Sequence, residues 1–396
     1  MVYIPSLNHG KCANKSFLGS TMLKKANNFL KKNILIDTHI DLPSRLLLNM
    51  EDITKQTSTG DFDLVRAKKG GLAGAFAAIY VPVTLEESGA LNFANSQIDL
   101  MEEIVREHQD ILALAPDINT LQQNHKNKLF SFILALENGA PISGNLENLH
   151  YFFERGIRYL TLAHSRNNHI CDSSYDDSER WSGLSDFGIE LIQEMNLIGM
   201  MIDVSHVSDK TFYDVLKYSK LPIAATHSSC RHFTPGWERN MSDEMIKDLA
   251  TNGGVIQINF GSDFLRGDIL ERSRNEKKEI SEILKRLSIP SDSKEADEIR
   301  DAYKTANPKV FATISDVANH IDHVVDLVGI DYVGIGSDYD GLGDQLPEGL
   351  KDVSSYPNLI AELFNRGYSE EYMKKICSDN FIRVWKSNEE SRKTNT

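Results

Sequence analysis

Eight short, nearly continuous apolar runs divide the chain, and longer amphipathic or polar stretches separate several of them. The runs cover residues 33–37, 72–81, 130–136, 157–162, 199–204, 222–226, 255–259 and 332–337. Runs of this length and apolar character are typical of parallel strands that are buried on both faces. Amphipathic segments at 187–195 and 243–250 predict helices between strands. The pattern favours an α/β fold of the (β/α)₈ TIM barrel type, with a doubly wound open sheet as the alternative.

Three segments fall outside this alternation. Residues 1–32 are rich in Lys and Asn and predict an N-terminal appendage, so the barrel domain is expected over residues 33–385. Residues from about 266 to 309 are highly charged and predict a solvated pair of helices, with a lid or a subunit contact as the alternative. Residues 386–396 predict a polar tail. The absence of an internal repeat or a low-complexity linker in the sequence favours a single domain.

Composition and charge narrow the class of protein. The chain is 41% hydrophobic and 25% charged, which is typical of a soluble globular protein. A formal charge of −14 argues against binding to nucleic acid, which requires a basic surface. The sequence shows neither an apolar secretion signal nor a C-terminal tail for a lipid anchor, so we expect a cytoplasmic protein without a membrane anchor. The four cysteines are scattered, and any metal site should therefore use His and carboxylate ligands.

Side chains that can bind metals or carry protons occur at the ends of the predicted strands. They are His39, Asp41, Glu137, His164, His206, His227 and Asp338. In a parallel barrel all strands point the same way, so these side chains should gather on one face, where catalytic groups of such barrels are found. The sequence therefore predicts a hydrolytic metal site at the carboxyl ends of the strands.

The coordination preferences of zinc indicate which of these residues would be its ligands. Zinc binds imidazole nitrogen and carboxylate oxygen and keeps an open position for water, and two-metal hydrolases usually share a bridging carboxylate. Two zinc ions that share Glu137 would each have three protein ligands if the set is His39, Asp41, Glu137, His206 and His227. Asp203 is expected to brace the barrel. The remaining histidines at positions His150, His169, His232, His320 and His323 are expected to be surface or structural residues.

Six separate segments carry a family resemblance. In chain order they are IDTHIDLPSR, ALENG, RYLTLAHS, IDVSHVS, THSS and GIGSDYDG. They resemble the signatures of the membrane dipeptidase (renal dipeptidase) family of zinc peptidases over about residues 33–385. The loop at 167–182 and the charged segment differ from the animal enzymes and look like those of a bacterial-type member. The resemblance implies a homodimer and two zinc ions, with His39 and Asp41 on the first, His206 and His227 on the second, and Glu137 as the bridge.

The resemblance also assigns roles in catalysis. His164 resembles the histidine that contacts the scissile carbonyl and stabilises its oxyanion. Asp338 resembles the aspartate that orients the bridging water and carries its proton. Arg239 looks like the arginine that holds the C-terminal carboxylate of the dipeptide, a role that suits the planar, bidentate guanidinium group.

These assignments imply zinc-dependent hydrolysis of dipeptides, including those with a C-terminal D-residue, by a hydroxide that bridges the two metals. One alternative is a two-metal barrel hydrolase that cleaves another amide, a lactam or an ester. Another is a non-hydrolytic tailoring relative, although such a protein should have lost metal ligands and this sequence has all five. Replacing Arg239 would distinguish a dipeptidase from the first alternative, because the loss of this arginine should affect only substrates with a free carboxylate.

Overall fold

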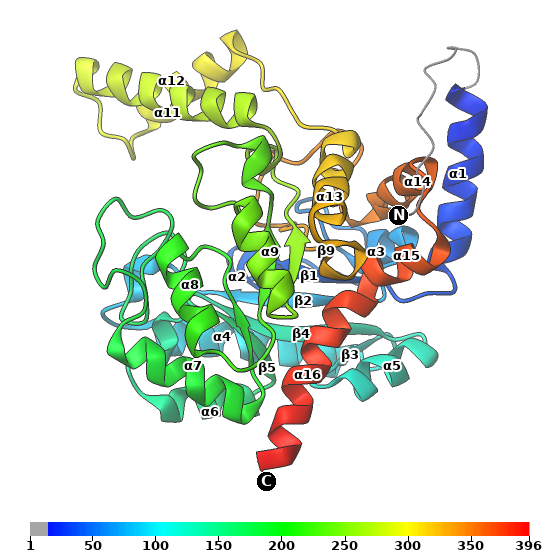
Figure 1. Cartoon of the computed structure of the whole chain (residues 1–396). Helices are drawn as coiled ribbons and strands as arrows, with labels where there is room; N and C mark the ends of the chain where they lie inside the picture. Colours follow the sequence, from blue (N-terminus) through cyan, green and yellow to red (C-terminus); the bar gives the residue numbers. More distant parts are fainter. Residues whose placement is uncertain (1–14, 396) are drawn as a thin grey trace.

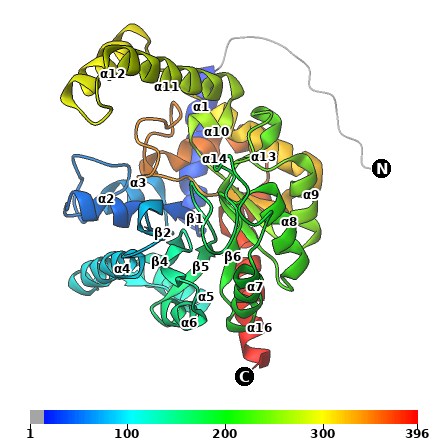
Figure 2. The ribbon, with the colours of Figure 1, turned by 90° about the vertical axis from the view of Figure 1, so that its left-hand side faces the viewer.

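The computed structural model describes residues 15–395 and shows a ring of parallel strands surrounded by helices (Figures 1 and 2). The strands are β1 (Ile36–Ile40), β2 (Gly74–Tyr80), β3 (Leu112–Leu114), β4 (Phe130–Glu137), β5 (Ile157–Thr161), β6 (Met201–Asp203), β7 (Ala224–Ser228), β8 (Val255–Ile258) and β9 (Val333–Ile335). The order around the ring is β1-β2-β4-β5-β6-β7-β8-β9, and all neighbours are parallel. A parallel bridge between Ile40 and Tyr339 brings the two ends of the sheet together. The expected (β/α)₈ barrel is confirmed.

Each of the eight predicted runs overlaps one barrel strand. The predicted limits of β1 and β7 end too early, because polar residues that the apolar pattern leaves out, such as His39 and His227, are buried within the strands. Strand β3 is additional and lies outside the ring, where it pairs only with the beginning of β4. It lies within the apolar stretch ILALA at 111–115, which is not among the eight predicted strands.

Helices follow most of the strands and cover the outside of the barrel (Figure 1). The α-helices are α1 (Lys15–Leu30), α2 (Leu42–Leu48), α3 (Leu64–Gly70), α4 (Ala90–Glu107), α5 (Ile118–Lys126), α6 (Leu146–Glu154), α7 (Asp186–Ile198), α8 (Asp209–Tyr218), α9 (Asp243–Thr251), α10 (Ser262–Leu265), α11 (Gly267–Leu287), α12 (Lys294–Ala306), α13 (Ile314–Val328), α14 (Tyr356–Asn365), α15 (Glu370–Lys374) and α16 (Asn380–Asn395). Helices α7 and α9 confirm the two predicted amphipathic helices, and serine side chains cap their N-termini. Within residues 15–395, no helix combines the length and the apolar character that a membrane span requires.

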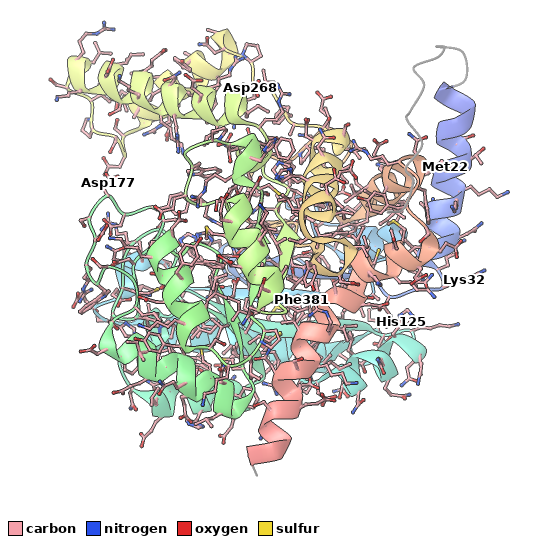
Figure 3. The ribbon with its side chains drawn as sticks, in the orientation of Figure 1. Met22, Lys32, His125, Asp177, Asp268 and Phe381 are labelled. Atoms are coloured by element: carbon pink, nitrogen blue, oxygen red, sulfur yellow. The ribbon has the colours of Figure 1, made fainter. Side chains whose placement is uncertain are left out.

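Helix α16 closes the amino-terminal end of the barrel. Its residues Phe381 (labelled in Figure 3) and Trp385 pack with inward-facing side chains of the strands. The ring of Phe76 on β2 lies 5.1 Å from that of Phe381 and 5.5 Å from that of Trp385, measured between centroids. Residues 386–395 of the expected polar tail continue this helix, and residue 396 lies outside the described residues. The amino-terminal half of the barrel interior is therefore filled by packed side chains.

Helix α1 lies outside the ring of strands and packs along α14 (Figure 1). Its side chains Ala26, Phe29 and Leu30 are buried in the main apolar core. Residues 1–14 of the expected appendage lie outside the described residues. The division of the chain into an appendage and a barrel domain stays a prediction.

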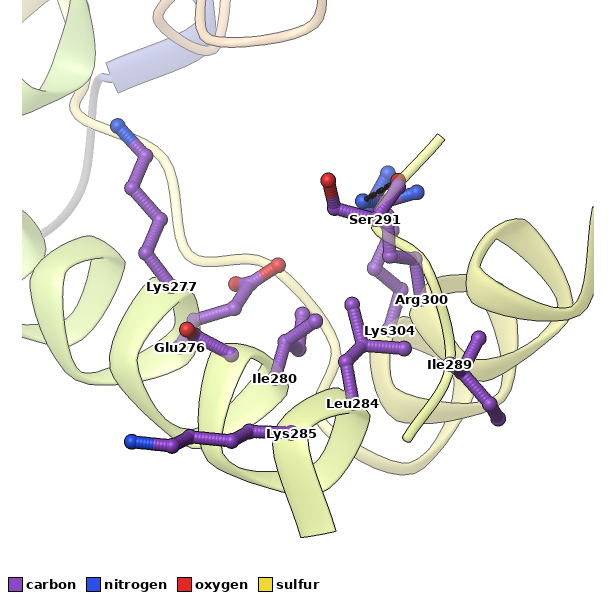
Figure 4. A pocket seen from close by; sticks show the side chains of 10 residues that line it. Glu276, Lys277, Ile280, Leu284, Lys285, Ile289, Ser291, Arg300 and Lys304 are labelled. Carbon is purple, nitrogen blue, oxygen red and sulfur yellow. Dashed lines mark hydrogen bonds between the residues drawn. The ribbon is translucent and has the colours of Figure 1, made fainter. Parts of the chain in front are cut away.

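The charged segment at 266–309 forms helices α11 and α12, which extend away from the barrel (Figures 1 and 2). The two helices share a small apolar cluster around Ile280, Leu284 and Ala296, separate from the barrel core. A cavity of about 500 Å³ lies between them, with lysine side chains around an apolar floor (Figure 4).

Candidate metal centre

The barrel brings the seven predicted strand-end residues together on its carboxyl face. His39 and His227 lie within β1 and β7, Asp41 directly follows β1, and Glu137 is the last residue of β4. The other three lie just beyond their strands: His164 after β5, His206 after β6 and Asp338 after β9. His206 and Asp338 have left-handed backbones, with φ of 71° and 64°. Non-glycine residues in this conformation cost energy and are concentrated at functional sites.

Glu137 lies at the centre of the cluster, and its side chain is buried. Its Oε2 is 3.4 Å from Nε2 of His39. Its Oε1 is 3.2 Å from Nε2 of His206, 3.4 Å from Nε2 of His227 and 3.7 Å from Nε2 of His164. The two oxygens of one carboxylate thus face two different sets of imidazoles.

A further carboxylate pair adjoins His39. Oδ2 of Asp41 lies 3.6 Å from Nε2 of His39, and ligand atoms of His39, Asp41 and Asp338 lie within 4.8 Å of one another. Oδ2 of Asp338 accepts a hydrogen bond of 2.8 Å from the side-chain amide of Asn259. Burial, together with the negative charge of Glu137, raises the pKa of Asp41 well above its usual range.

The histidines of the cluster fall into two electrostatic classes. Burial disfavours the charged form of His39, but the carboxylates of Glu137 and Asp41 outweigh burial and raise its pKa to about 10. Burial and the neighbouring charge of His39 lower the pKa of His227 to about 4. Burial and the nearby charge of Arg239 lower the pKa of His206 well below its usual value. The site therefore combines the neutral imidazoles of His206 and His227 with carboxylates that hold a proton on His39 and attract a cation.

The donor atoms fit a divalent metal of the zinc type. Nε2 of His39 is buried and has no hydrogen-bond partner among the described residues, although it faces two carboxylates. A bound cation would replace the proton that these carboxylates otherwise hold on the ring. The cysteines Cys171, Cys230 and Cys377 are buried and free, while Cys12 lies outside the described residues. Imidazole nitrogens and carboxylate oxygens are the ligands that remain, and zinc accepts both.

A second layer of hydrogen bonds orients two of these imidazoles. The hydroxyl of Tyr159 donates to the carbonyl oxygen of Thr38 (2.9 Å) and lies 2.7 Å from Nδ1 of His39. The hydroxyl of Thr226 donates to Asp203 (2.7 Å) and lies 2.9 Å from Nδ1 of His227. In both cases the hydroxyl proton is already used, so Nδ1–H must donate and Nε2 keeps its lone pair for a metal.

Asp203 lies one step further from the cluster, where it accepts hydrogen bonds from neighbouring strands. Its carboxylate binds the hydroxyl of Thr161 at 2.5 Å and the backbone N–H of Thr226 at 2.8 Å. These contacts join β5, β6 and β7 below the site. Tyr159 and Thr226 were not among the predicted site residues, because a tyrosine or a threonine within a buried strand has the same sequence signal as a core residue.

Arg239 lies beside the histidine cluster and is almost fully buried. Its guanidinium donates to the hydroxyl of Ser228 (2.9 Å) and to the carbonyl oxygen of His227 (2.8 Å). Its Nε is buried without a partner among the described residues. The guanidinium lies over the ring of Phe264, 5.1 Å from its centroid, and this ring packs against Trp237 with centroids 4.8 Å apart. A buried, partly unpaired guanidinium next to these candidate metal ligands can bind an anionic group of a ligand.

Comparison with known proteins identifies the family. The family described as Membrane dipeptidase (Peptidase family M19) matches residues 23–396. The chain belongs to this dipeptidase family. Dipeptidase 3 of Mus musculus is 29% identical over an alignment of 369 residues, and the match covers 90% of this chain and 65% of that protein. The uncharacterized dipeptidase C965.12 of Schizosaccharomyces pombe is 31% identical over 378 residues, covering 90% of this chain and 80% of the yeast protein.

Solved structures of family members have the same fold. The probable dipeptidase PvdM from Pseudomonas aeruginosa matches with a TM-score of 0.81 and 25% identity, over 94% of this chain and 99% of PvdM. A metallopeptidase from Rhodobacter sphaeroides, liganded with a phosphinate mimic of the dipeptide L-Ala-D-Ala, matches with a TM-score of 0.74 and 26% identity, over 90% of this chain and 99% of that chain. The family resemblance of the strand-end motifs is confirmed, and so is the enzyme class, a metallo-dipeptidase.

Proposed function

We propose that this protein hydrolyses dipeptides at a centre of two zinc ions held by the carboxyl ends of the barrel strands. The position of Glu137 carries the proposal, because its two oxygens face different imidazoles at 3.2–3.4 Å. A carboxylate in this position is the usual bridge between the two ions of a binuclear hydrolase. The dipeptide mimic bound to the Rhodobacter sphaeroides relative supports a dipeptide as substrate, including one with a C-terminal D-residue.

The ligands divide between the two ions around the bridge. His39 and Asp41 would hold the first ion and His206 and His227 the second, with Glu137 shared. When bound, the two ions supply Lewis acidity and lower the pKa of water towards neutrality. The left-handed backbone of His206 and the hydrogen bonds behind His39 and His227 fix the directions of these imidazoles before any metal binds.

Arg239 selects substrates with a free carboxylate close to the scissile bond. Its guanidinium already contacts the backbone of His227, so a carboxylate that it binds lies next to the metal ligands. In a dipeptide, the C-terminal carboxylate is only one residue away from the peptide bond that is cleaved. A longer peptide would place a neutral amide beside Arg239 and lose a charge-assisted hydrogen bond.

His164 and Asp338 act on the reacting atoms. Burial lowers the pKa of His164, so its imidazole is neutral and can donate a hydrogen bond to the oxyanion that develops on the scissile carbonyl. Asp338 is held by the side chain of Asn259 and faces His39 and Asp41, where it orients the attacking water. Its carboxylate takes the proton of this water and passes it to the leaving amine.

The test compares free dipeptides with their C-terminal amides. Zinc-loaded protein should release amino acids from L-Ala-L-Ala and L-Ala-D-Ala and should act poorly on the corresponding amides. Arg239→Ala should lower kcat/KM for the free dipeptides by about 100-fold or more, because a charged group at the site loses its partner. The same substitution should change the slow cleavage of the amides little.

Arg274→Ala is the matched control, because this exposed arginine on α11 lies 5.9 Å from the ring of Trp237 and is not among the proposed site residues. It should leave the selectivity for free dipeptides intact. No release of amino acids from a broad dipeptide panel would contradict the proposal. Cleavage of amides or lactams that is indifferent to Arg239 would favour the alternative of another two-metal hydrolase.

A further inference from the structure

A second group of metal-binding side chains lies outside the barrel mouth. His232, Asp243 and His323 each offer one ligand atom, and these atoms lie within 4.8 Å of one another. His232 belongs to the short 3-10 helix η3 (Arg231–Phe233) after β7, Asp243 is the first residue of α9, and His323 lies on α13. The sequence alone assigns both histidines to surface or structural positions. The fold brings them together with Asp243, although His323 and Asp243 are 80 residues apart.

The geometry of the group is close to that of a coordination shell. Nε2 of His323 lies 2.8 Å from Oδ1 of Asp243. The rings of His232 and His323 are stacked, with centroids 4.3 Å apart and 26° between the planes. Ligands that bind zinc at about 2.0–2.2 Å are roughly 3 Å from each other, so a cation can enter with small side-chain shifts.

Neighbouring rings hold the imidazoles in place. The ring of Phe233 lies 4.9 Å from that of His232 and 5.6 Å from that of His323. The side chains of His323 and Asp243 are only 16% and 31% exposed, so binding would cost them little conformational entropy. His232 is exposed, which leaves one side of the group open to ions from solvent. The group is therefore ordered and accessible.

We propose that His232, Asp243 and His323 form a separate site for a divalent cation of the zinc type. Two imidazoles and one carboxylate suit zinc, nickel or copper rather than magnesium or calcium, which prefer oxygen ligands. Water would complete the coordination on the exposed side. The site shares no residue with the barrel cluster, so it does not depend on the proposed dipeptide hydrolysis.

The position of the site gives it a structural consequence. His232 precedes Arg239 in the segment that connects β7 to α9, and Asp243 follows it as the first residue of α9. The backbone N–H of Arg231 donates to the carbonyl oxygen of Met241 at 2.8 Å, so the two ends of this segment already lie side by side. A bound cation would tie both ends to α13 and reduce the mobility of the segment that presents Arg239.

The test measures bound metal per chain in the full-length protein. The barrel centre is first filled with zinc, and equilibrium dialysis against Zn²⁺ alone then titrates the remaining sites. We expect the wild type to bind one more equivalent than His232→Ala, or to bind it at least tenfold more tightly. His323→Asn should show the same loss. Amide hydrogen exchange over residues 231–243 should slow in the wild type when this equivalent binds, and should not change in His232→Ala.

The matched control is His150→Ala. His150 is an exposed histidine that also pairs with a carboxylate, since its Nε2 lies 2.8 Å from Glu194, but it belongs to no group of three metal ligands among the described residues. This variant should bind metal as the wild type does. Identical binding curves for the wild type and His232→Ala up to about 1 mM zinc would overturn the proposal. This outcome is independent of whether the protein cleaves dipeptides.

Discussion

Tyr159 controls the tautomer of His39, a proposed metal ligand, through a single hydroxyl group. Its hydroxyl donates to the carbonyl oxygen of Thr38, and it can therefore only accept from Nδ1 of His39. This fixes the tautomer of His39 and directs Nε2 at Glu137 and Asp41. Thr226 does the same for His227, with Asp203 behind it. Outer partners of this kind orient the ligands and raise the affinity for the metal.

Tyr159→Phe should lower the affinity for the metal nearest His39 by about 10- to 100-fold, because the imidazole loses the acceptor that fixes its tautomer. The phenyl ring still fills the barrel interior, so folding should be retained. Competition with a chromophoric chelator measures the affinity, and circular dichroism checks the fold. Tyr368→Phe removes a hydroxyl that donates to Asp322 at 2.7 Å, away from the site, and should leave the affinity unchanged. Equal loss in both variants would show that Tyr159 has no specific role at the metal centre.

At the scale of elements, helix α13 is fastened to two neighbouring segments by His320. Nδ1 of this buried histidine accepts the backbone N–H of Cys230 at 3.0 Å, after β7. Its Nε2 lies 3.1 Å from the carbonyl oxygen of Leu265 at the end of α10 and donates to it. Only the neutral ring can make both bonds. Burial accordingly lowers the pKa of His320 to about 3.

This contact predicts a pH dependence of stability. In the unfolded chain a histidine takes up a proton near pH 6.5, whereas His320 in the folded protein does so only near its pKa of about 3. The stabilisation is therefore complete above pH 6.5 and is lost as the pH falls towards 3. The free energy of unfolding should decrease by about 1.4 kcal/mol per pH unit on account of this one residue. The free energy of unfolding, measured by urea titration at several pH values between 7 and 4.5, should fall less steeply with pH for His320→Gln than for the wild type. An equal pH dependence in the two proteins would contradict the assignment.

At the scale of the molecule, the barrel could be predicted because each strand that is buried on both faces produces an apolar run. The strand-end residues such as Glu137 and His206 could be located for the same reason, since parallel strands end on one face. The left-handed backbone conformations of His206 and Asp338 could not be predicted from the sequence, because they depend on the turns that the completed barrel imposes. The group at His232 could not be foreseen either, since it forms only when α13 packs beside α9. The homodimer, the cellular location and the catalytic roles of individual residues stay predictions.

Removal of metal should destabilise the whole barrel rather than the site alone. Residues from six barrel strands converge on the centre, where carboxylates such as Glu137 and Asp41 are buried beside one another. A cation that binds only the folded state adds about 4 kcal/mol to the free energy of unfolding at a thousandfold excess over its Kd. Chelation should therefore lower Tm by several degrees, and added zinc should restore it. Glu137→Gln should have a Tm that responds little to chelator, and a large response would place the stabilising ion elsewhere.

The packing of α16 against the amino-terminal end of the barrel has a consequence for substrate entry and product release. Phe381 and Trp385 pack against the inward-facing side chains at the amino-terminal end of the barrel, so the carboxyl rim is where a dipeptide would enter under the proposed function. Both amino acids released from a cleaved dipeptide must leave by the opening through which the next dipeptide arrives. If Arg239 binds the C-terminal carboxylate as proposed, the product amino acid that retains this group keeps its contact with the guanidinium after cleavage and should leave last. The exit of this product, rather than cleavage of the peptide bond, would then set the pace at high substrate concentration.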